Sequence, residues 1–236
     1  MKDLAKIPKI LHHVWLGPNS IPDNLKKCLN TCYVEHLSWK HMFWTDDNLP
    51  DITLFREEYN MDNNYARKSD IVRLVALYQY GGVYLDMDVE AIKPIDDLLT
   101  GHRFVVATEA GKTDRKDIRE THINNAVIAS TKRNKTVSKL LTKMKEKYKT
   151  IEIEENASPL SYVSPLGGPC LFNALHKTGD LDGEYNKIYT HEYFYPLHYS
   201  ERVIGQENWT IPSDVNTLDE KTHLVHHFAA SWYHQK

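Results

Sequence analysis

Two carboxylates stand two residues apart at the end of an apolar run, in the segment VYLDMDV at residues 83–89. If this run continues as a strand, side chains repeat with a period of two, so Asp86 and Asp88 face one side and Met87 faces the other. Two carboxylates that project together repel each other and are stabilised by a cation beside them. The segment therefore predicts a divalent-metal site at the end of a buried strand.

An Asp-x-Asp pair alone is a weak signal, since most such pairs are solvated loop carboxylates. The preceding residues add to it. Residues 65–78 carry apolar side chains at helical spacing, and Asp70 and Arg73 lie three residues apart on a neighbouring face of that helix. Gly81 and Gly82 then allow a tight turn into the strand. A helix with Asp and Arg, a glycine pair and a strand ending in two Asp form a rarer arrangement.

This order of elements, Ser69-Asp70-x-x-Arg73 followed by GGVYLDMD at residues 81–88, resembles the DXD sugar-binding region of glycosyltransferase family 32. That family includes yeast-type initiating mannosyltransferases and capsular and lipopolysaccharide transferases, and the catalytic domains of the large clostridial glucosylating toxins are similar. The resemblance implies an α/β fold of the GT-A type, with a mixed central sheet flanked by helices. It implies one domain over residues 1–236, in which 7–130 bind the nucleotide sugar and metal, and 131–236 supply the acceptor part and a C-terminal metal- and diphosphate-binding element.

The resemblance also assigns roles within the central region. It implies that Asp88 holds Mn²⁺ or Mg²⁺ directly, and that Asp86 does so directly or through water, or holds the ribose. Asp70 and Arg73 would bind hydroxyl groups of the donor sugar, and these four residues are the candidate catalytic set. Tyr84, inside the motif, is a further candidate for substrate binding.

Three smaller segments carry further expectations. The segment IPKI, followed by His-x-x-Trp-x-Gly, resembles the first strand of the family, which implies that Trp15 stacks on the nucleotide base; the alternative is a core aromatic. In the expected strand 123–129, Asn124 would reach the donor sugar, with Asn125 as the alternative. Gly168 lies in a turn that leads into a helix and would help to shape the sugar pocket.

The C-terminal element, HHFAASW at residues 226–232, resembles the closing element of the family. A late histidine there would complete the metal shell. His226 and His227 face opposite sides of a strand, so one of them is the ligand; we expect His227, with His226 as the alternative. Ser231 and Trp232 would contact the diphosphate.

Composition narrows the class of protein. The net charge of −3 argues against a general nucleic-acid binder, and no apolar run approaches the roughly 18 residues of a membrane span. Pro8, His12 and His13 interrupt any signal-peptide core. Three cysteines form no paired framework, which indicates reduced thiols and a cytoplasmic protein.

The helix expected over residues 134–150 is basic along one flank, with Lys135, Lys139, Lys143 and Lys147 beside an apolar stripe. Such a run is usually a solvated helix face. The sharper hypothesis is peripheral contact with anionic lipid at the inner face of the membrane, or with a lipid-diphosphate acceptor.

The function expected from the sequence is a metal-dependent, retaining glycosyltransferase. It would move a hexose from a nucleotide-diphosphate sugar, UDP-hexose being favoured over GDP-mannose, to a saccharide or lipid-linked acceptor in capsular or other surface polysaccharide synthesis. Two alternatives stay open. One is a haloacid-dehalogenase-like phosphatase with Asp86 as nucleophile, which a phospho-enzyme would reveal. The other is a nucleotide-sugar-binding module without turnover.

Overall fold

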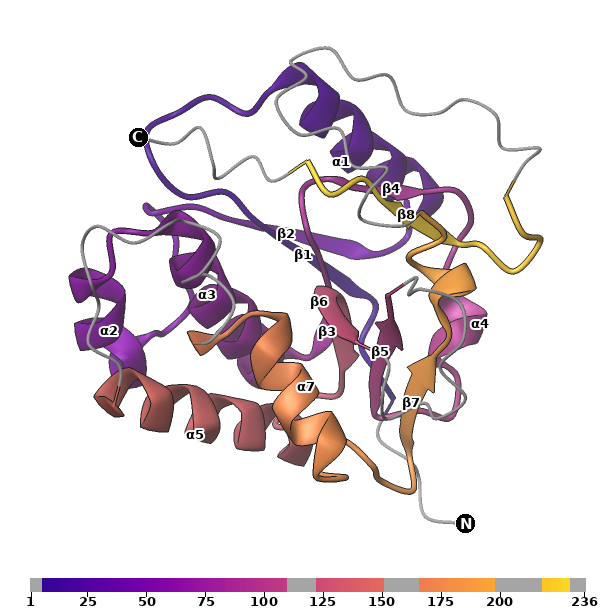
Figure 1. Ribbon diagram of the computed structural model, residues 1–236. Coiled ribbons are helices and arrows are strands. Elements are labelled where there is room, and N and C mark those ends of the chain that lie inside the picture. Colours follow the sequence, from indigo (N-terminus) through magenta and orange to yellow (C-terminus); the bar gives the residue numbers. More distant parts are fainter. Residues whose placement is uncertain (1–5, 110–121, 151–165, 198–217, 230–236) are drawn as a thin grey trace.

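The fold is built around a mixed sheet that lies between layers of helices (Figure 1). The computed structural model describes residues 6–109, 122–150, 166–197 and 218–229. Its strands are β1 (Ile10–Val14), β2 (Lys40–Trp44), β3 (Gly82–Leu85), β4 (Val89–Ala91), β5 (Phe104–Thr108), β6 (Ile123–Ser130), β7 (Asn186–Tyr189) and β8 (Leu224–His226). Its helices are α1 (Asp23–Glu35), η1 (Thr53–Phe55), α2 (Arg56–Met61), α3 (Tyr65–Tyr80), α4 (Asp96–Leu99), α5 (Lys135–Thr150), α7 (Pro169–Lys177) and η3 (His191–Tyr193).

Among the described residues the large sheet has six strands in the order β2-β1-β3-β6-β5-β7. Strands β1, β2 and β3 run parallel, β6 runs antiparallel to both β3 and β5, and β7 runs parallel to β5. A second, two-stranded sheet pairs β4 with β8, which brings the C-terminal element beside the chain that follows β3. The expected α/β class with a mixed sheet is confirmed.

The glycine pair before β3 is required by close backbone approach. Gly81 and Gly82 have φ of 67° and 105°, a region that favours glycine. A Cβ on Gly82 would lie 2.5 Å from the Ile10 carbonyl oxygen, and one on Gly81 would lie 2.6 Å from the Lys132 nitrogen. The pair therefore lets the chain leave α3 and enter the sheet directly beside β1.

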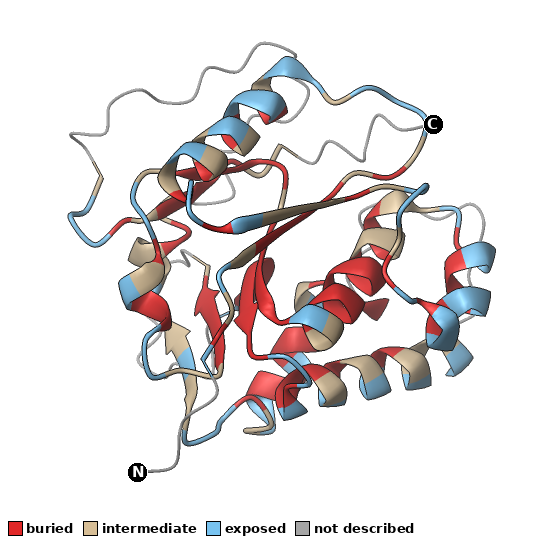
Figure 2. Cartoon of the chain, turned by 180° about the vertical axis from the view of Figure 1, so that it is seen from behind, coloured by how far each residue is buried: buried red, intermediate tan, exposed pale blue. Residues whose placement is uncertain are grey.

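Helices α3, α5 and α7 cover one face of the large sheet, and their apolar side chains form the larger core cluster with residues of β3, β5 and β6. Figure 2 shows that α3 is buried over most of its length, whereas α5 exposes its outer side. The stripe predicted for α5 is confirmed: Val137, Leu140 and Met144 are fully buried, and Leu141 and Tyr148 pack against the cluster.

A buried ion pair fixes the start of α3. Arg67 donates two hydrogen bonds of 2.7 Å to Asp62, and Asp62 also accepts from the Tyr148 hydroxyl of α5 at 3.0 Å. The Asn64 side chain caps the helix by accepting from the backbone nitrogens of Ala66 and Arg67. These contacts set the position of α3, which carries Asp70 and Arg73 into the interior.

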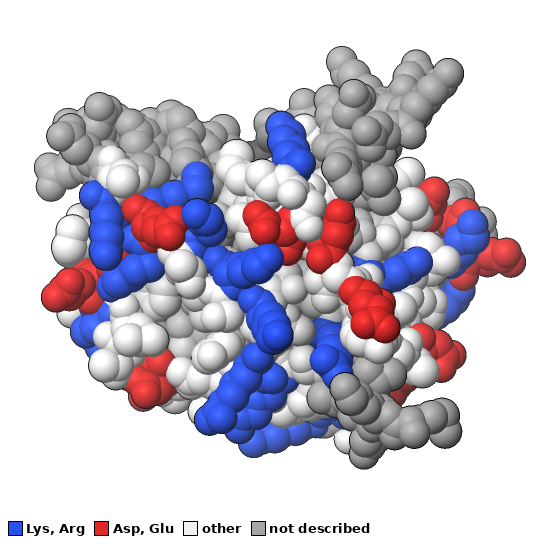
Figure 3. Space-filling view, turned by 90° about the horizontal axis from the view of Figure 1, so that it is seen from below, with Lys and Arg blue, Asp and Glu red and all other residues white. Residues whose placement is uncertain are grey.

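Lysine and arginine side chains gather on the face of the molecule seen from below, where α5 lies (Figure 3). Several of these lysines have acidic partners: Lys139 lies 3.0 Å from Asp180 and Lys143 lies 2.7 Å from Glu146. A salt bridge also joins Lys145 to Glu58. No helix within the described ranges is both long enough and apolar enough to cross a membrane.

Candidate donor and metal site

The two motif carboxylates lie in a turn and not on a continuous strand. Strand β3 ends at Leu85, and the Val89 nitrogen donates to the Asp86 carbonyl at 3.1 Å, which closes a turn before β4. The prediction that Asp86 and Asp88 lie on a continuous strand, whose period of two would align them, is therefore wrong. The carboxylates still come together, because the turn brings both beside the end of β8.

Asp88 is held by the C-terminal element. The Ala229 nitrogen donates to Asp88 Oδ2 at 2.7 Å, and His226 Nε2 lies 3.3 Å from Asp88 Oδ1. Burial raises the pKa of Asp88, but the attraction of His226 and the hydrogen bonds outweigh it and lower that pKa to about 2. For His226, burial lowers the pKa, yet Asp88 raises it above its ordinary value. Asp88 and His226 thus favour each other's charged forms.

Asp86, Asp88 and His226 offer ligand atoms that all lie within 4.8 Å of one another. Two carboxylate oxygens and one imidazole nitrogen suit Mn²⁺. Mg²⁺ would bind to the carboxylate oxygens of the same set. His227, the favoured ligand in the sequence analysis, points elsewhere: its Nε2 lies 3.1 Å from Glu90 Oε2. The geometry therefore favours the alternative, His226.

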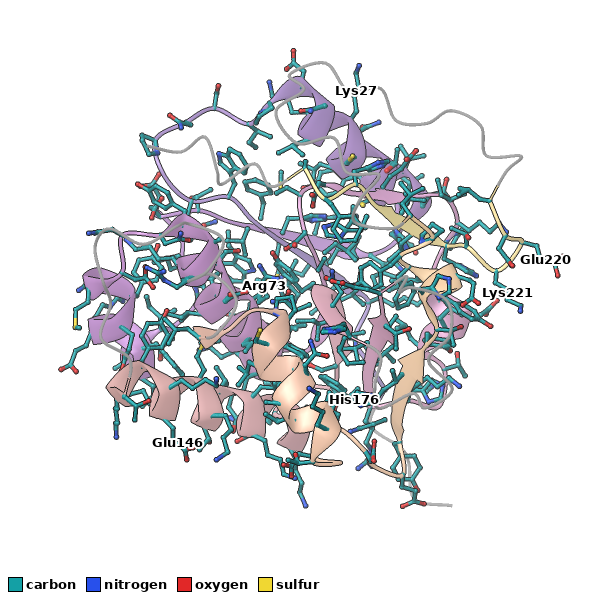
Figure 4. The ribbon with its side chains drawn as sticks, viewed as in Figure 1. Lys27, Arg73, Glu146, His176, Glu220 and Lys221 are labelled. Atoms are coloured by element: carbon teal, nitrogen blue, oxygen red, sulfur yellow. The ribbon has the colours of Figure 1, made fainter. Side chains whose placement is uncertain are left out.

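Arg73 links the turn to the helix and to β6. Its Nη2 lies 3.2 Å from Asp86 Oδ1 and 3.3 Å from Asp70 Oδ1, and its Nη1 donates to the Asn125 carbonyl at 2.8 Å. The guanidinium also lies over the Tyr84 ring, 4.4 Å from its centroid. Figure 4 shows Arg73 reaching from α3 into the interior.

Tyr84 supports Asp86 from within the protein. It is 1 % exposed, and its hydroxyl donates to Asp86 Oδ1 at 2.5 Å. The substrate-binding role expected for Tyr84 stays a prediction; the contacts observed are those of a residue that orients Asp86.

Asp70 is buried beside both Arg73 and Asn125, whose side-chain nitrogen donates to Asp70 Oδ1 at 2.9 Å. Burial raises the pKa of the Asp70 carboxyl and the charge of Asp86 adds to this, while Arg73 and the Asn125 hydrogen bond lower it; the result is a pKa of about 7. Asp70 Oδ2 is buried and has no hydrogen-bond partner among the described residues. Asp70 is therefore a carboxyl with one oxygen engaged and one available.

The two asparagines of β6 have different partners. Asn125, the alternative in the sequence analysis, contacts Asp70, whereas Asn124 Nδ2 donates to Glu109 Oε1 at 2.5 Å. Glu109 lies just after β5, and its charge acts on His226 and on Tyr195. Sequence reasoning missed Glu109; a polar residue directly after the buried strand VVAT was the available signal.

Two more of the predicted residues, Trp15 and Gly168, lie within the described part of the chain. Trp15 follows β1, is partly exposed, and packs beside the cluster that contains Met87 of the turn. Its Nε1 donates to the Asn19 carbonyl at 2.7 Å. Gly168 is the N-cap of α7. Ser231 and Trp232 lie outside the described residues.

Comparison with known proteins points to the part of the chain that contains Asp70, Arg73, Asp86 and Asp88. Residues 22–105 match the family model described as "Glycosyltransferase sugar-binding region containing DXD motif". Among curated proteins, "Inositol phosphoceramide mannosyltransferase 1" of Schizosaccharomyces pombe is 32% identical over 114 residues, covering 44% of this chain and 35% of that protein. "Inositol phosphoceramide mannosyltransferase 3" of the same yeast is 34% identical over 100 residues, covering 40% and 28%. The chain thus spans about a third of the length of these relatives.

Solved structures share the fold. "PaToxG Glycosyltransferase" superposes with a TM-score of 0.56 at 20% identity, over 75% of this chain and 72% of that one. The ligand-free glycosyltransferase domain of the YGT toxin superposes with a TM-score of 0.51 at 13% identity, over 78% and 80%. These likenesses establish a GT-A fold, and the resemblance to the DXD region is confirmed over residues 22–105.

Proposed function

We propose that this chain, whose residues 22–105 are the DXD-containing sugar-binding region of a glycosyltransferase family, transfers a hexosyl group from a nucleotide-diphosphate sugar. One observation carries the proposal. The candidate metal ligands Asp86, Asp88 and His226 adjoin the Asp70–Arg73 pair, because Arg73 lies 3.2 Å from Asp86. A cation site and a site for sugar hydroxyls therefore adjoin, as the diphosphate and the hexose of one donor do.

Asp86, Asp88 and His226 would hold Mn²⁺ or Mg²⁺, which, when bound, offsets negative charge on the departing diphosphate. Arg73 keeps Asp86 in place and brings a buried positive charge to the junction between the two parts of the site. Tyr84 orients Asp86 through the hydrogen bond from its hydroxyl to Asp86 Oδ1. Asp70 offers its available oxygen to a donor hydroxyl, and Trp15 offers an aromatic face to the base.

We also propose retention of the anomeric configuration, on the strength of the family resemblance. In that scheme the acceptor hydroxyl attacks from the face that the diphosphate leaves, and its proton goes to the departing diphosphate. The C1–O bond to the diphosphate breaks as the C1–O bond to the acceptor forms, so the products are a nucleoside diphosphate and the glycosylated acceptor.

The donor and acceptor are proposals of the same kind. The names of the relatives favour a mannosyl group and a lipid acceptor, whereas the sequence expectation favours UDP-hexose and a saccharide or lipid-linked acceptor of a surface polysaccharide. A cytoplasmic location with peripheral membrane contact through α5 belongs to this proposal as well. Lys135 and Lys147 of α5 would make that contact with the membrane.

The test is slow hydrolysis of UDP-hexoses and GDP-mannose in the presence of Mn²⁺, measured as release of nucleoside diphosphate. We expect the wild type to cleave one donor and the Asp88→Asn variant to lose at least a hundredfold in kcat, because one ligand charge is lost. Asp180→Asn serves as the matched control and should cleave normally, because Asp180 is a partly exposed turn residue whose charged partner is Lys139 of α5.

Other outcomes would redirect the assignment. A phospho-enzyme at Asp86 would establish the phosphatase alternative. Metal-dependent binding of a nucleotide sugar with neither hydrolysis nor transfer would establish the binding module.

A further inference from the structure

The segment that follows β1, residues 15–19, carries Trp15 and is tied to the neighbouring strand; it is called the Trp15 loop below. Trp15 Nε1 donates to the Asn19 carbonyl at 2.7 Å, so the indole closes the loop on itself. At the centre of the loop, the Gly17 nitrogen donates to Asp46 Oδ2 at 2.7 Å. Asp46 lies just after β2, which pairs with β1. One carboxylate therefore joins the segments that follow two adjacent strands.

The second oxygen of Asp46 is anchored to α2. Tyr59 of that helix is buried, and its hydroxyl donates to Asp46 Oδ1 at 2.9 Å. Burial raises the pKa of Tyr59, and the hydrogen bond to Asp46 raises it further, so this hydroxyl keeps its proton and remains a donor. The exposed carboxylate of Asp46 thus bridges the Trp15 loop and a buried side chain, with one oxygen for each.

The ring of Tyr65, the first residue of α3, supports the same loop. Gly17 has a φ of 91°, and a Cβ there would lie 2.7 Å from Tyr65 Cζ, so glycine lets the loop rest on this ring. Lys68 Nζ lies over both tyrosine rings, 4.8 Å from the centroid of Tyr59 and 5.6 Å from that of Tyr65. Asp46 therefore holds the Trp15 loop against a platform formed by α2 and α3.

We propose that Asp46 is a positioning residue of the nucleotide subsite: it fixes the Trp15 loop, and with it the indole face on which the base stacks. This rests on the proposed function, which assigns Trp15 to the base. Each Asp46 oxygen already accepts a hydrogen bond from the protein, so the carboxylate acts through the loop. Hydrogen bonds to a charged acceptor are the stronger kind, so removal of this carboxylate loosens the loop and weakens binding of every ligand that carries the base.

The experiment is a double-mutant cycle on Asp46 and Trp15. The probe is the nucleoside diphosphate that the wild type releases from its donor, and its binding is measured in the presence of Mn²⁺. We expect Asp46→Ala to bind this nucleotide at least fivefold more weakly than wild type, and Trp15→Ala at least tenfold more weakly. The double variant should bind within twofold of Trp15→Ala, because a residue that acts only through the indole then has nothing left to position.

Kinetics separate this role from a general loss of structure. In Asp46→Ala, KM for the nucleotide sugar should rise at least fivefold, while kcat stays within threefold and the Kd for Mn²⁺ within twofold. A purely structural lesion would lower the active fraction, and so kcat, and leave KM unchanged.

Two further variants complete the comparison. Asp46→Asn should recover most of the affinity, because its amide oxygen can accept from the Gly17 nitrogen and its amide nitrogen can donate to the Tyr59 hydroxyl. Asp51→Ala is the matched control, since Asp51 is an exposed aspartate of the same loop whose side chain accepts from Thr53. Its nucleotide binding and its KM should equal those of wild type.

Unchanged nucleotide affinity in either single variant overturns the proposal. Losses that add in the double variant also overturn it, since Asp46 would then act independently of the indole. If Asp46→Ala does not fold, Tyr59→Phe takes its place in the cycle. A loss of threefold or more that disappears in the Trp15→Ala background then supports the proposal, and any other result overturns it. If the wild type binds no nucleotide and cleaves no nucleotide sugar, the proposed function itself has failed, and the positioning role fails with it.

Discussion

At the scale of single residues, the site balances buried charges. Arg73 faces two carboxylates, Asp70 and Asp86, while Asp88 is paired with His226. Burial makes each isolated charge costly, so each one needs its partner. Asp70 remains the least compensated member, which its pKa of about 7 reflects. Asp70 therefore changes charge near neutral pH, whereas Asp88 stays ionised.

The two neighbouring histidines should differ sharply when each is replaced by glutamine. His226→Gln keeps a hydrogen-bonding group near Asp88 but is a poor metal ligand, so the dissociation constant for Mn²⁺ should rise at least tenfold. His227→Gln should bind Mn²⁺ within threefold of wild type, and the free energy of unfolding should fall by about 1–3 kcal/mol because the Glu90 contact is impaired.

Calorimetric titration with Mn²⁺ and urea unfolding provide the two measurements. Strong loss of Mn²⁺ affinity in His227→Gln with normal affinity in His226→Gln would restore His227 as the ligand.

At the scale of elements, α3 is the part that connects stability with the site. Its Asn64 cap and the buried Asp62–Arg67 pair fix its first turn, and its middle carries Asp70 and Arg73. The glycine pair at its end delivers the chain into β3 and so to Asp86. One helix thus sets the separation between the sugar-binding pair and the metal turn.

Removal of the cap should cost stability and spare the chemistry. Asn64→Ala leaves two backbone nitrogens without their acceptor, which should lower the free energy of unfolding by about 1 kcal/mol and the melting temperature by roughly 2–4 °C. Donor hydrolysis well below the melting temperature should be unchanged, since Asp70 lies beyond the first turn. Asn64→Ser should restore most of the loss, and Asn60→Ala, at an exposed position of α2, is the control. A melting temperature equal to wild type would contradict the capping role.

At the scale of the whole molecule, buried neutral histidines make stability depend on pH. Burial lowers the pKa of His12 to about 4 and that of His13 to about 3, and neighbouring Lys40 or histidines add to the effect. Above pH 6.5 both are neutral in the folded and unfolded chain. Below it only the unfolded chain takes up the protons, so the free energy of unfolding falls as the pH falls toward these lowered values.

His13→Phe should weaken this dependence. His13 Nε2 has no partner in the described structure, and its ring meets the Tyr33 ring edge-on, a contact that phenylalanine can keep. Between pH 6.5 and about 4 the variant should lose up to about 1.4 kcal/mol less per pH unit than wild type. Urea unfolding of both proteins at pH 7.5, 5.5 and 4.5 measures this difference in the pH dependence of the free energy of unfolding.

Asp70 contributes in the opposite sense, because its raised pKa makes the folded state gain stability as the pH falls from about 7. This contribution is the same in wild type and in His13→Phe, so it cancels when the two proteins are compared. Parallel curves for the two proteins would show that His13 does not titrate as described.

The sequence by itself determined the elements and the central chemistry. The apolar run before Asp86, the glycine pair and the stripes of α3 and α5 are local patterns, and local patterns follow from backbone periodicity. Their order along the chain was enough to indicate an α/β fold and a DXD region. Such patterns do not show which distant element supplies the partner of a given side chain.

Tertiary structure decided those partners. The pairing of β4 with β8 sets Val89 opposite His226, and a shift of one residue would exchange the sides of His226 and His227. An irregularity between Val105 and Ala107 changes the β5–β6 register, so that Asn125 and not Asn124 contacts Asp70. Gly167 meets Asp70 across 97 residues of sequence only because α5 and α7 pack beside α3. Sequence periodicity fixes which way a chain alternates, whereas register and packing fix which distant groups share a site.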